Sequence, residues 1–120
     1  MQTIKMFKSF SFAFKGLKYA LNENNFRFHI LATILVTLCG VCFHISNPEW
    51  LAIILCCGLV LSMEIINTAI EKMIDIISPE FHKTAGMVKD LAAAAVLMMA
   101  ITSFVVFLTI FYKYIMCVIR

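Results

Sequence analysis

Glu64-Ile-Ile-Asn67-Thr-Ala-Ile-Glu71-Lys-Met-Ile-Asp75 places three carboxylates and one amide in a segment that is otherwise apolar enough to cross a bilayer. In a helix that turns about 100° per residue, Asn67, Glu71 and Asp75 all lie within roughly 60° of Glu64 around the axis. These four side chains therefore form one polar stripe. A carboxylate near the bilayer centre costs on the order of 2.5 to 3.5 kcal/mol, so the stripe should face a protein interior, a cation or water. This pattern predicts a functional site.

The composition around the stripe is that of an integral membrane protein. The chain has 120 residues, of which 62% are hydrophobic and only 14% are charged. Three apolar segments, at about 28–45, 50–77 and 91–119, are each near or above the roughly 20 residues that span the hydrocarbon. We therefore expect one all-α membrane domain over residues 1–120, with three transmembrane helices joined by a very short first connection and a polar second connection at 78–90.

The N-terminal segment 4–22 predicts a further helix of a different kind. Its apolar residues recur at steps of three and four, with lysines beside them, which is typical of an amphipathic helix lying at the membrane surface. An alternative is that this helix packs wholly against the transmembrane bundle. The apolar residues are Ile4, Phe7, Phe10, Phe14, Leu17 and Leu21.

The distribution of basic residues indicates the orientation. Lysines gather around the second connection and in the N-terminal segment, whereas the first connection, Ser46-Asn47-Pro48-Glu49, has neither Lys nor Arg. The positive-inside rule then places the N-terminus and the second connection in the cytoplasm. The net charge of +3 gives no argument for a nucleic-acid partner. Five cysteines, an odd number, all lie in apolar segments, which argues against a disulfide framework.

Several charged residues outside the deepest part of the stripe should meet at the cytoplasmic membrane face. Carboxylates together with a lysine favour a magnesium nucleotide, because Mg²⁺ takes one or two carboxylates plus phosphate oxygens and the lysine offsets phosphate charge. Glu64, set deeper, would meet a lipid hydroxyl. For Glu23 an alternative is a surface ion pair with Arg27, four residues along the chain. The residues that meet at this face are Glu23, Glu71, Asp75, Lys89 and Asp90.

Three stretches of the chain resemble the prokaryotic diacylglycerol kinase and undecaprenol kinase family. They are Asn24-Asn-Phe-Arg27-Phe-His29, the polar stripe itself, and Lys89-Asp-Leu-Ala-Ala-Ala-Ala-Val-Leu97. The resemblance covers nearly the whole chain. It implies a homotrimeric enzyme of the bacterial cytoplasmic (inner) membrane, with the N-terminus and the active site in the cytoplasm. The implied reaction transfers the γ-phosphoryl group of MgATP to the hydroxyl of a membrane lipid alcohol.

The resemblance also implies a role for individual residues. Glu64 falls at the family's catalytic carboxylate, with Asn67 beside it, and Glu64 and Ala93 fall at lipid-binding positions. Glu23 and Glu71 fall at the metal-binding positions. The nucleotide-binding positions are Glu71, Glu80, His82, Lys89 and Asp90. Possible supporting positions are Asp75, Arg27, Lys5 and Phe12.

Two departures from the family pattern bear on the acceptor. Phe12 stands where the diacylglycerol kinase branch tends to have a Tyr, and Ala93 replaces a Ser. Together with the loop Ser78-Pro79-Glu80 they favour undecaprenol slightly over diacylglycerol. Asp75 either tunes the site through Lys89 or closes the stripe at the water boundary.

Two alternative functions of a different class are also compatible with the sequence. One is a small cation- or proton-coupled membrane subunit that uses Glu64, Glu71 and Asp75 as a relay, although the outer half of every predicted span lacks acids. Another is a purely structural helix-packing module, for which buried acids would be costly. The resemblance gives His29 and His44 no role.

Overall fold

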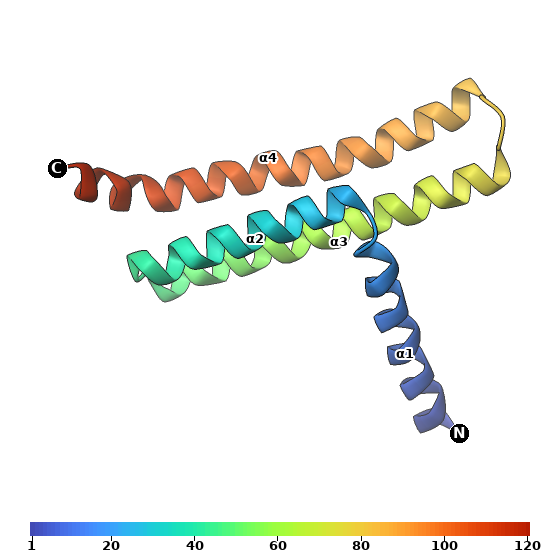
Figure 1. The fold of residues 1–120 in the computed structure, drawn as a ribbon, viewed down its shortest axis with the longest axis horizontal. Coiled ribbons are helices and arrows are strands. Elements are labelled where there is room, and N and C mark those ends of the chain that lie inside the picture. The colour runs from blue at the N-terminus through green and yellow to red at the C-terminus, as the bar shows by residue number, and fades with distance from the viewer.

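The computed structural model describes the whole chain, residues 1–120, as four α-helices without strands (Figure 1). Three of the helices are long and apolar enough to cross a membrane. Of the 101 backbone hydrogen bonds, 90 lie within the helices, as a chain in hydrocarbon requires. The predicted class, an all-α membrane protein with three transmembrane helices, is confirmed. The helices are α1 (Gln2–Ala20), α2 (Asn24–Phe43), α3 (Asn47–Ile77) and α4 (Lys83–Ile119).

Helix α3 is the centre of the bundle. It packs against α2 on one side and against α4 on the other, while α1 projects away from the bundle at a steep angle (Figure 1). Only the C-terminal end of α1 reaches α3, and Ala20 is its one buried residue. The alternative that this helix packs wholly against the bundle is therefore not what the structure shows. Its phenylalanine-rich face is left exposed.

In the short turn between α2 and α3, specific residues end the first helix and begin the second. His44, in the left-handed region with φ of 51°, ends α2. Ser46 and Glu49 then form a capping box, in which the Ser46 side chain accepts from the Glu49 backbone and the Glu49 side chain accepts from the Ser46 backbone. This reciprocal pair satisfies amide groups that the first turn of a helix cannot satisfy itself. The two helices are held as an antiparallel hairpin.

Close approach of α2 and α3 at this turn depends on Gly40. A Cβ atom added there would lie 2.7 Å from Cη2 of Trp50 and 3.1 Å from Cδ1 of Ile45. Gly40 is buried, so the indole ring lies directly over the α2 backbone. Small residues at such crossings allow membrane helices to pack closely.

We expect Gly40→Ala to destabilise the protein by about 1 to 3 kcal/mol, because the added methyl group must displace the Trp50 ring. Unfolding in detergent micelles, followed by tryptophan fluorescence, measures this change. Gly16→Ala on α1 is the matched control, since a Cβ there meets nothing within 4 Å. A Gly40→Ala variant as stable as the control would contradict the close approach.

Helix α4 is fastened to α3 near both of its ends. At the turn end of the bundle, next to residues 44–46, Glu49 Oε1 accepts from the Tyr114 hydroxyl at 2.6 Å and Glu49 Oε2 lies 3.0 Å from Lys113 Nζ. At the loop end, next to residues 78–82, Lys89 pairs with Asp75. Apolar contacts fill the turn half of the bundle. The buried cluster there is Ile45, Ile53, Cys57, Ile110 and Phe111.

The connection between α3 and α4 is shorter than the predicted 78–90. Helix α4 begins at Lys83, because the His82 side chain caps it by accepting a hydrogen bond from the Thr84 backbone N–H at 3.2 Å. Residues 83–90 thus form the first turns of α4 instead of a loop ahead of a span at 91–119. The other boundaries differ from the predicted ones by at most four residues, since polar residues such as Asn24 and Asn47 enter the first helical turns.

Candidate functional site

Burial along the polar stripe on α3 falls steadily toward the loop end. Glu64 is 3% exposed and Asn67 is 5% exposed. Glu71 is half-buried and Asp75 is exposed. The deepest carboxylate is therefore enclosed by protein within this single chain, while the shallow end of the stripe opens to the surroundings.

Within the stripe, one buried acceptor has no partner. Asn67 Nδ2 donates a hydrogen bond to Glu71 Oε1 at 3.2 Å. The other end of the amide, Asn67 Oδ1, is buried without a hydrogen-bond partner. A buried polar atom left unpaired costs about 1 to 3 kcal/mol, and such an atom needs an explanation in a stable protein. An acceptor placed between two acids fits a bound cation or a hydroxyl group donated by a ligand.

His29 is the residue that faces Glu64 across the helix interface. Its Nε2 atom lies 3.9 Å from Glu64 Oε2. Glu71 and Glu23 are near enough to repel the Glu64 charge. Neither the sequence pattern nor the family resemblance assigns His29 a role. Its position in a predicted span could have identified it, because an ionisable side chain inside a membrane span is by itself a candidate functional residue.

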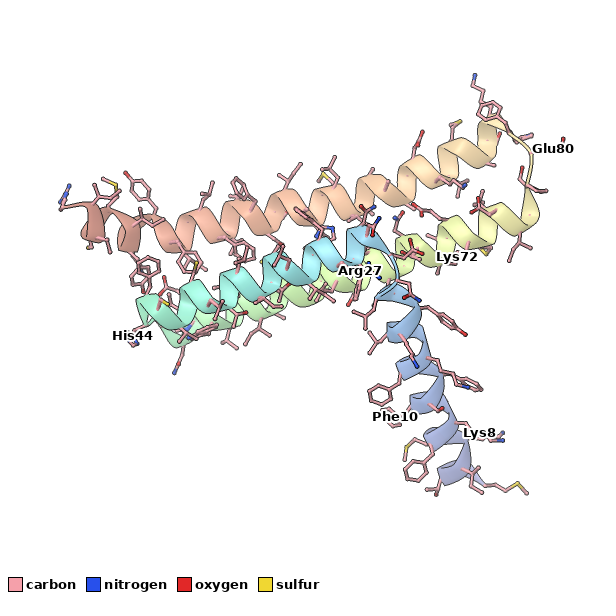
Figure 2. The ribbon with its side chains drawn as sticks, in the orientation of Figure 1. Lys8, Phe10, Arg27, His44, Lys72 and Glu80 are labelled. Atoms are coloured by element: carbon pink, nitrogen blue, oxygen red, sulfur yellow. The ribbon has the colours of Figure 1, made fainter.

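Glu23 lies at the corner between α1 and α2, against α3. Its Oε1 atom is 3.4 Å from Lys72 Nζ, so Glu23 lies at the level of Glu71, the neighbour of Lys72. The surface ion pair between Glu23 and Arg27 is not formed, because the Arg27 Nε donates to the Leu21 carbonyl at 2.6 Å. Arg27 and Lys72 both lie beside this corner in Figure 2.

A second group of predicted residues meets at the loop end. A cavity of about 210 Å³ lies between the end of α3 and the start of α4, and Asp75, Glu80, His82 and Lys89 line it. Glu80 lies far from the corner, at the end of the bundle in Figure 2. Lys89 pairs with Asp75 across this cavity, which is the link through which Asp75 was expected to act. Asp90 is exposed and does not line this cavity.

Three predicted supporting or lipid-binding positions stay apart from the stripe of their own chain. Lys5 and Phe12 are exposed on α1, where the Lys15 ammonium lies 5.7 Å from the centre of the Phe12 ring. Ala93 is exposed on α4. The single chain therefore does not bring these three residues to Glu64.

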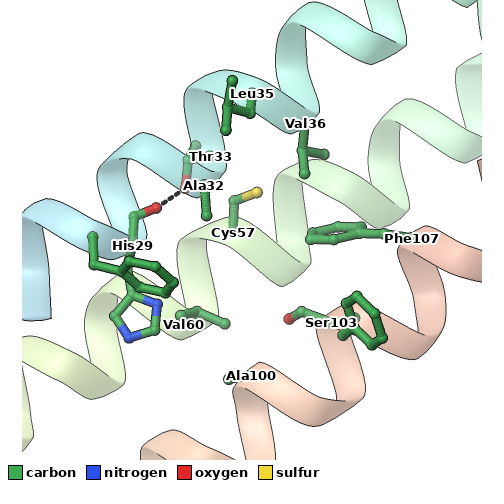
Figure 3. A pocket seen from close by; sticks show the side chains of 12 residues that line it. His29, Ala32, Thr33, Leu35, Val36, Cys57, Val60, Ala100, Ser103 and Phe107 are labelled. Carbon is green, nitrogen blue, oxygen red and sulfur yellow. Dashed lines mark hydrogen bonds between the residues drawn. The ribbon is translucent and has the colours of Figure 1, made fainter.

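An apolar groove lies beside the buried end of the stripe. It has a volume of about 340 Å³ and is formed by α2, α3 and α4. Figure 3 shows His29, Val60 and Ala100 at one end of it and Val36 and Phe107 at the other. The eight helical steps from residue 28 to residue 36 correspond to about 12 Å along α2. The groove therefore runs from the level of Glu64 toward the turn end of the bundle.

The side chains that could hold a metal ion are few. No group of three or more His, Cys, Asp or Glu residues is clustered in the chain. Glu23 and Glu71 supply carboxylates at one level, and the unpaired Asn67 Oδ1 lies one helical turn from Glu71. Mg²⁺ is held in many proteins by one or two carboxylates together with substrate phosphates. This donor set fits an ion that a phosphate ligand helps to bind.

Replacing Asn67 with leucine should change the free energy of unfolding by no more than about 1 kcal/mol, because removal of the buried unpaired acceptor offsets loss of the hydrogen bond to the half-buried Glu71. Unfolding in micelles measures this change. Ile53→Ala, at a fully buried apolar position, should lower stability in the same assay and shows that the assay responds to core changes. A large loss of stability in Asn67→Leu would mean that the amide holds the fold together.

Comparisons with known proteins agree with one another. The model of a family described as prokaryotic diacylglycerol kinase matches residues 11–111. An undecaprenol kinase from Bacillus subtilis (strain 168) is 41% identical over 108 residues, which cover 89% of this chain and 88% of that protein. A diacylglycerol kinase from Escherichia coli (strain K12) is 32% identical over 100 residues, which cover 82% of each chain.

Three helices that are long and apolar enough to cross a membrane define a multi-pass membrane protein, and the comparisons place it in the lipid kinase class. The chain belongs to the prokaryotic diacylglycerol kinase family. As a kinase of this family it transfers a phosphoryl group from ATP to a lipid in the membrane, a reaction that generally uses a divalent metal ion.

Proposed function

We propose that this kinase transfers the γ-phosphoryl group of MgATP to the hydroxyl of a membrane lipid alcohol, with undecaprenol preferred over diacylglycerol. The observation that carries the proposal is the position of Glu64. It is a buried carboxylate whose neighbour His29 lines the apolar groove, and it begins the polar stripe that leads to the loop end. A lipid hydroxyl and a nucleotide phosphate would meet at this point.

Glu64 acts as the general base or orients the acceptor. The lipid hydroxyl oxygen forms a bond to the γ-phosphorus, its proton passes to the Glu64 carboxylate, and the bond from the γ-phosphorus to the bridging oxygen breaks to release ADP. Phosphoryl transfer needs positioning and charge neutralisation more than covalent chemistry. Asn67 supports Glu71 through its Nδ2 and leaves Oδ1 free for the reacting groups.

Glu23 and Glu71 hold the Mg²⁺ ion in this proposal. When bound, the ion neutralises charge on the β- and γ-phosphates. The contact of Glu23 with the Lys72 ammonium supports this assignment, because it shows that the corner already accepts a cation. The Lys72 side chain is 63% exposed, so it can move away from Glu23.

The nucleotide occupies the cavity at the loop end and the shallow part of the stripe. Glu80, His82 and Lys89 line that cavity, and Lys89 offsets phosphate charge. Asp75 holds the Lys89 ammonium in place. Asp90 follows Lys89 on the first turns of α4 and contacts the nucleotide from the exposed side. Arg27 lies at the corner, where it reaches either a phosphate or the headgroup region.

The groove favours an acceptor without polar groups near its hydroxyl. Its lining is mostly apolar, with His29, Thr33 and Ser103 as the polar exceptions. An isoprenoid alcohol carries no other polar group, whereas diacylglycerol brings two esters that need solvation or hydrogen-bond donors. The higher identity to the Bacillus subtilis protein supports the same preference.

A homotrimer with sites between subunits accounts for the residues that stay apart in one chain. Lys5 and Phe12 on α1, and Ala93 on α4, are exposed and would approach the stripe of a neighbouring copy. The exposed apolar face of α1 suits the surface of the cytoplasmic leaflet. The basic loop end and the N-terminus would then face the cytoplasm, where ATP is available, in the bacterial inner membrane.

The test is phosphoryl transfer from labelled MgATP by the purified protein in mixed micelles that contain undecaprenol or diacylglycerol. Glu64→Gln should abolish transfer to both lipids, because the amide cannot accept the hydroxyl proton. Glu49→Gln is the matched control, since it makes the same chemical change at the other end of α3 and should keep the rate. Equal rates for the two lipids would overturn the acceptor preference, and a normal rate in Glu64→Gln would overturn the catalytic assignment.

Glu23→Gln should raise the Mg²⁺ concentration for half-maximal rate by about tenfold, since one carboxylate ligand is lost. Titration of the rate with Mg²⁺ at fixed ATP measures this change. Lys72→Met breaks the same corner ion pair without removing the carboxylate, so it should not raise the requirement. The same increase in both variants would assign the effect to the ion pair instead of the metal.

A further inference from the structure

We propose that His29 is a positioning residue that holds the Glu64 carboxylate toward the groove, at the point where the acceptor hydroxyl must lie. The inference rests on the proposed role of Glu64 as the group that meets this hydroxyl. It adds a residue to which neither the family resemblance nor the sequence pattern gave a function.

The two side chains face one another across the α2–α3 interface in a shielded place. His29 Nε2 lies 3.9 Å from Glu64 Oε2, and the side chains are only 15% and 5% exposed. In such surroundings a hydrogen bond is electrostatically stronger than in water. The separation is too long for a hydrogen bond in this state. Contacts of catalytic groups commonly tighten when substrate binds, and a small rotation of either side chain closes the gap.

Glu64 needs such a partner because its other polar neighbours, Asn67, Glu71 and Glu23, all approach its carboxylate from the loop side of the stripe. The last side-chain torsion of a glutamate is broad, so the carboxylate is poorly fixed without a contact. Asn67 is engaged with Glu71 through its N–H group. Glu71 and Glu23 repel the Glu64 charge. The imidazole N–H of a neutral His29 is the donor on the opposite side.

His29 itself is held at the junction between the groove and the stripe. The neighbouring Phe28 ring stands nearly perpendicular to the imidazole, with ring centres 5.6 Å apart and an angle of 75° between the planes. The imidazole lines the groove together with Phe28, Val60 and Ala100, and Figure 3 shows it beside Val60 at the end of the groove. An acceptor whose chain lies in the groove therefore presents its hydroxyl next to His29.

The experiment measures kcat and the KM values for ATP and lipid in His29→Ala and His29→Gln, with undecaprenol in mixed micelles. His29→Ala should lower kcat by about 10- to 100-fold, with KM for ATP and thermal stability unchanged. His29→Gln places an amide N–H near the position of Nε2 and should recover most of the rate. His44→Asn is the control, because it changes a histidine at the opposite end of α2, far from Glu64, to a residue that tolerates the left-handed backbone.

Rescue of kcat by glutamine, with thermal stability unchanged in both variants, supports a donor at this position, since a packing role would show as lost stability in His29→Ala. A kcat within about twofold of wild type in His29→Ala would overturn the proposal, and so would a His29→Gln variant as slow as His29→Ala. Glu64→Gln, measured in the same assay, distinguishes failure of the positioning role of His29 from failure of the proposed function. If it is inactive while His29→Ala is normal, only the positioning role fails; if it keeps the normal rate, the proposed function fails as well.

Discussion

A peptide group in hydrocarbon has no water to bond, so every segment of this chain that crosses the bilayer must satisfy its own N–H and C=O groups. Long helices are the result, and 90 of the 101 backbone hydrogen bonds lie inside them. The same surroundings make any charged side chain within a span costly unless the protein encloses it. The central position of α3, with α2 on one side and α4 on the other, provides that enclosure for Glu64.

The proposed sites for the nucleotide and for the lipid acceptor lie at different depths along α3. The eleven helical steps from Glu64 to Asp75 correspond to about 16.5 Å of helix rise. The cavity at the loop end is therefore more than two helical turns away from the apolar groove. If Lys89 binds the nucleotide as proposed, the phosphate chain would extend along the polar stripe to reach Glu64, and this would give a role to the polar residues that recur on one face of the helix.

Much of this arrangement could be predicted from the sequence, because it depends on local periodicity. Apolar length predicts the spans, and helical spacing predicts that Glu64, Asn67, Glu71 and Asp75 share a face. The partners of these residues could not be predicted in the same way. The contacts of Glu64 with His29 and of Glu23 with Lys72 join residues that are distant in sequence, and the spacing of four between Glu23 and Arg27 pointed to a local pair instead.

The start of α4 also could not be predicted correctly from the sequence. The polar segment 78–90 was expected to be a loop, yet His82 caps a helix from Lys83 onward, since one side-chain acceptor is enough to start a helix among polar residues. The consequence is that Lys89 and Asp90 are carried on a rigid helix. Their separation from the end of α3 is thereby fixed by backbone geometry and by the contact between Lys89 and Asp75.

Helix α4 forms polar side-chain contacts with α3 near its two ends and none along its middle. Glu49 holds the helix at the turn end and Asp75 holds it at the loop end, 26 positions apart on α3, or about 39 Å of helix rise. Between them lie the groove and only van der Waals contacts, which lipid tails can replace at little cost because they are as apolar as the side chains. An apolar chain lying in the groove would therefore meet α4 along a stretch that packing alone holds to α3, while the polar contacts near both ends keep the helix in register.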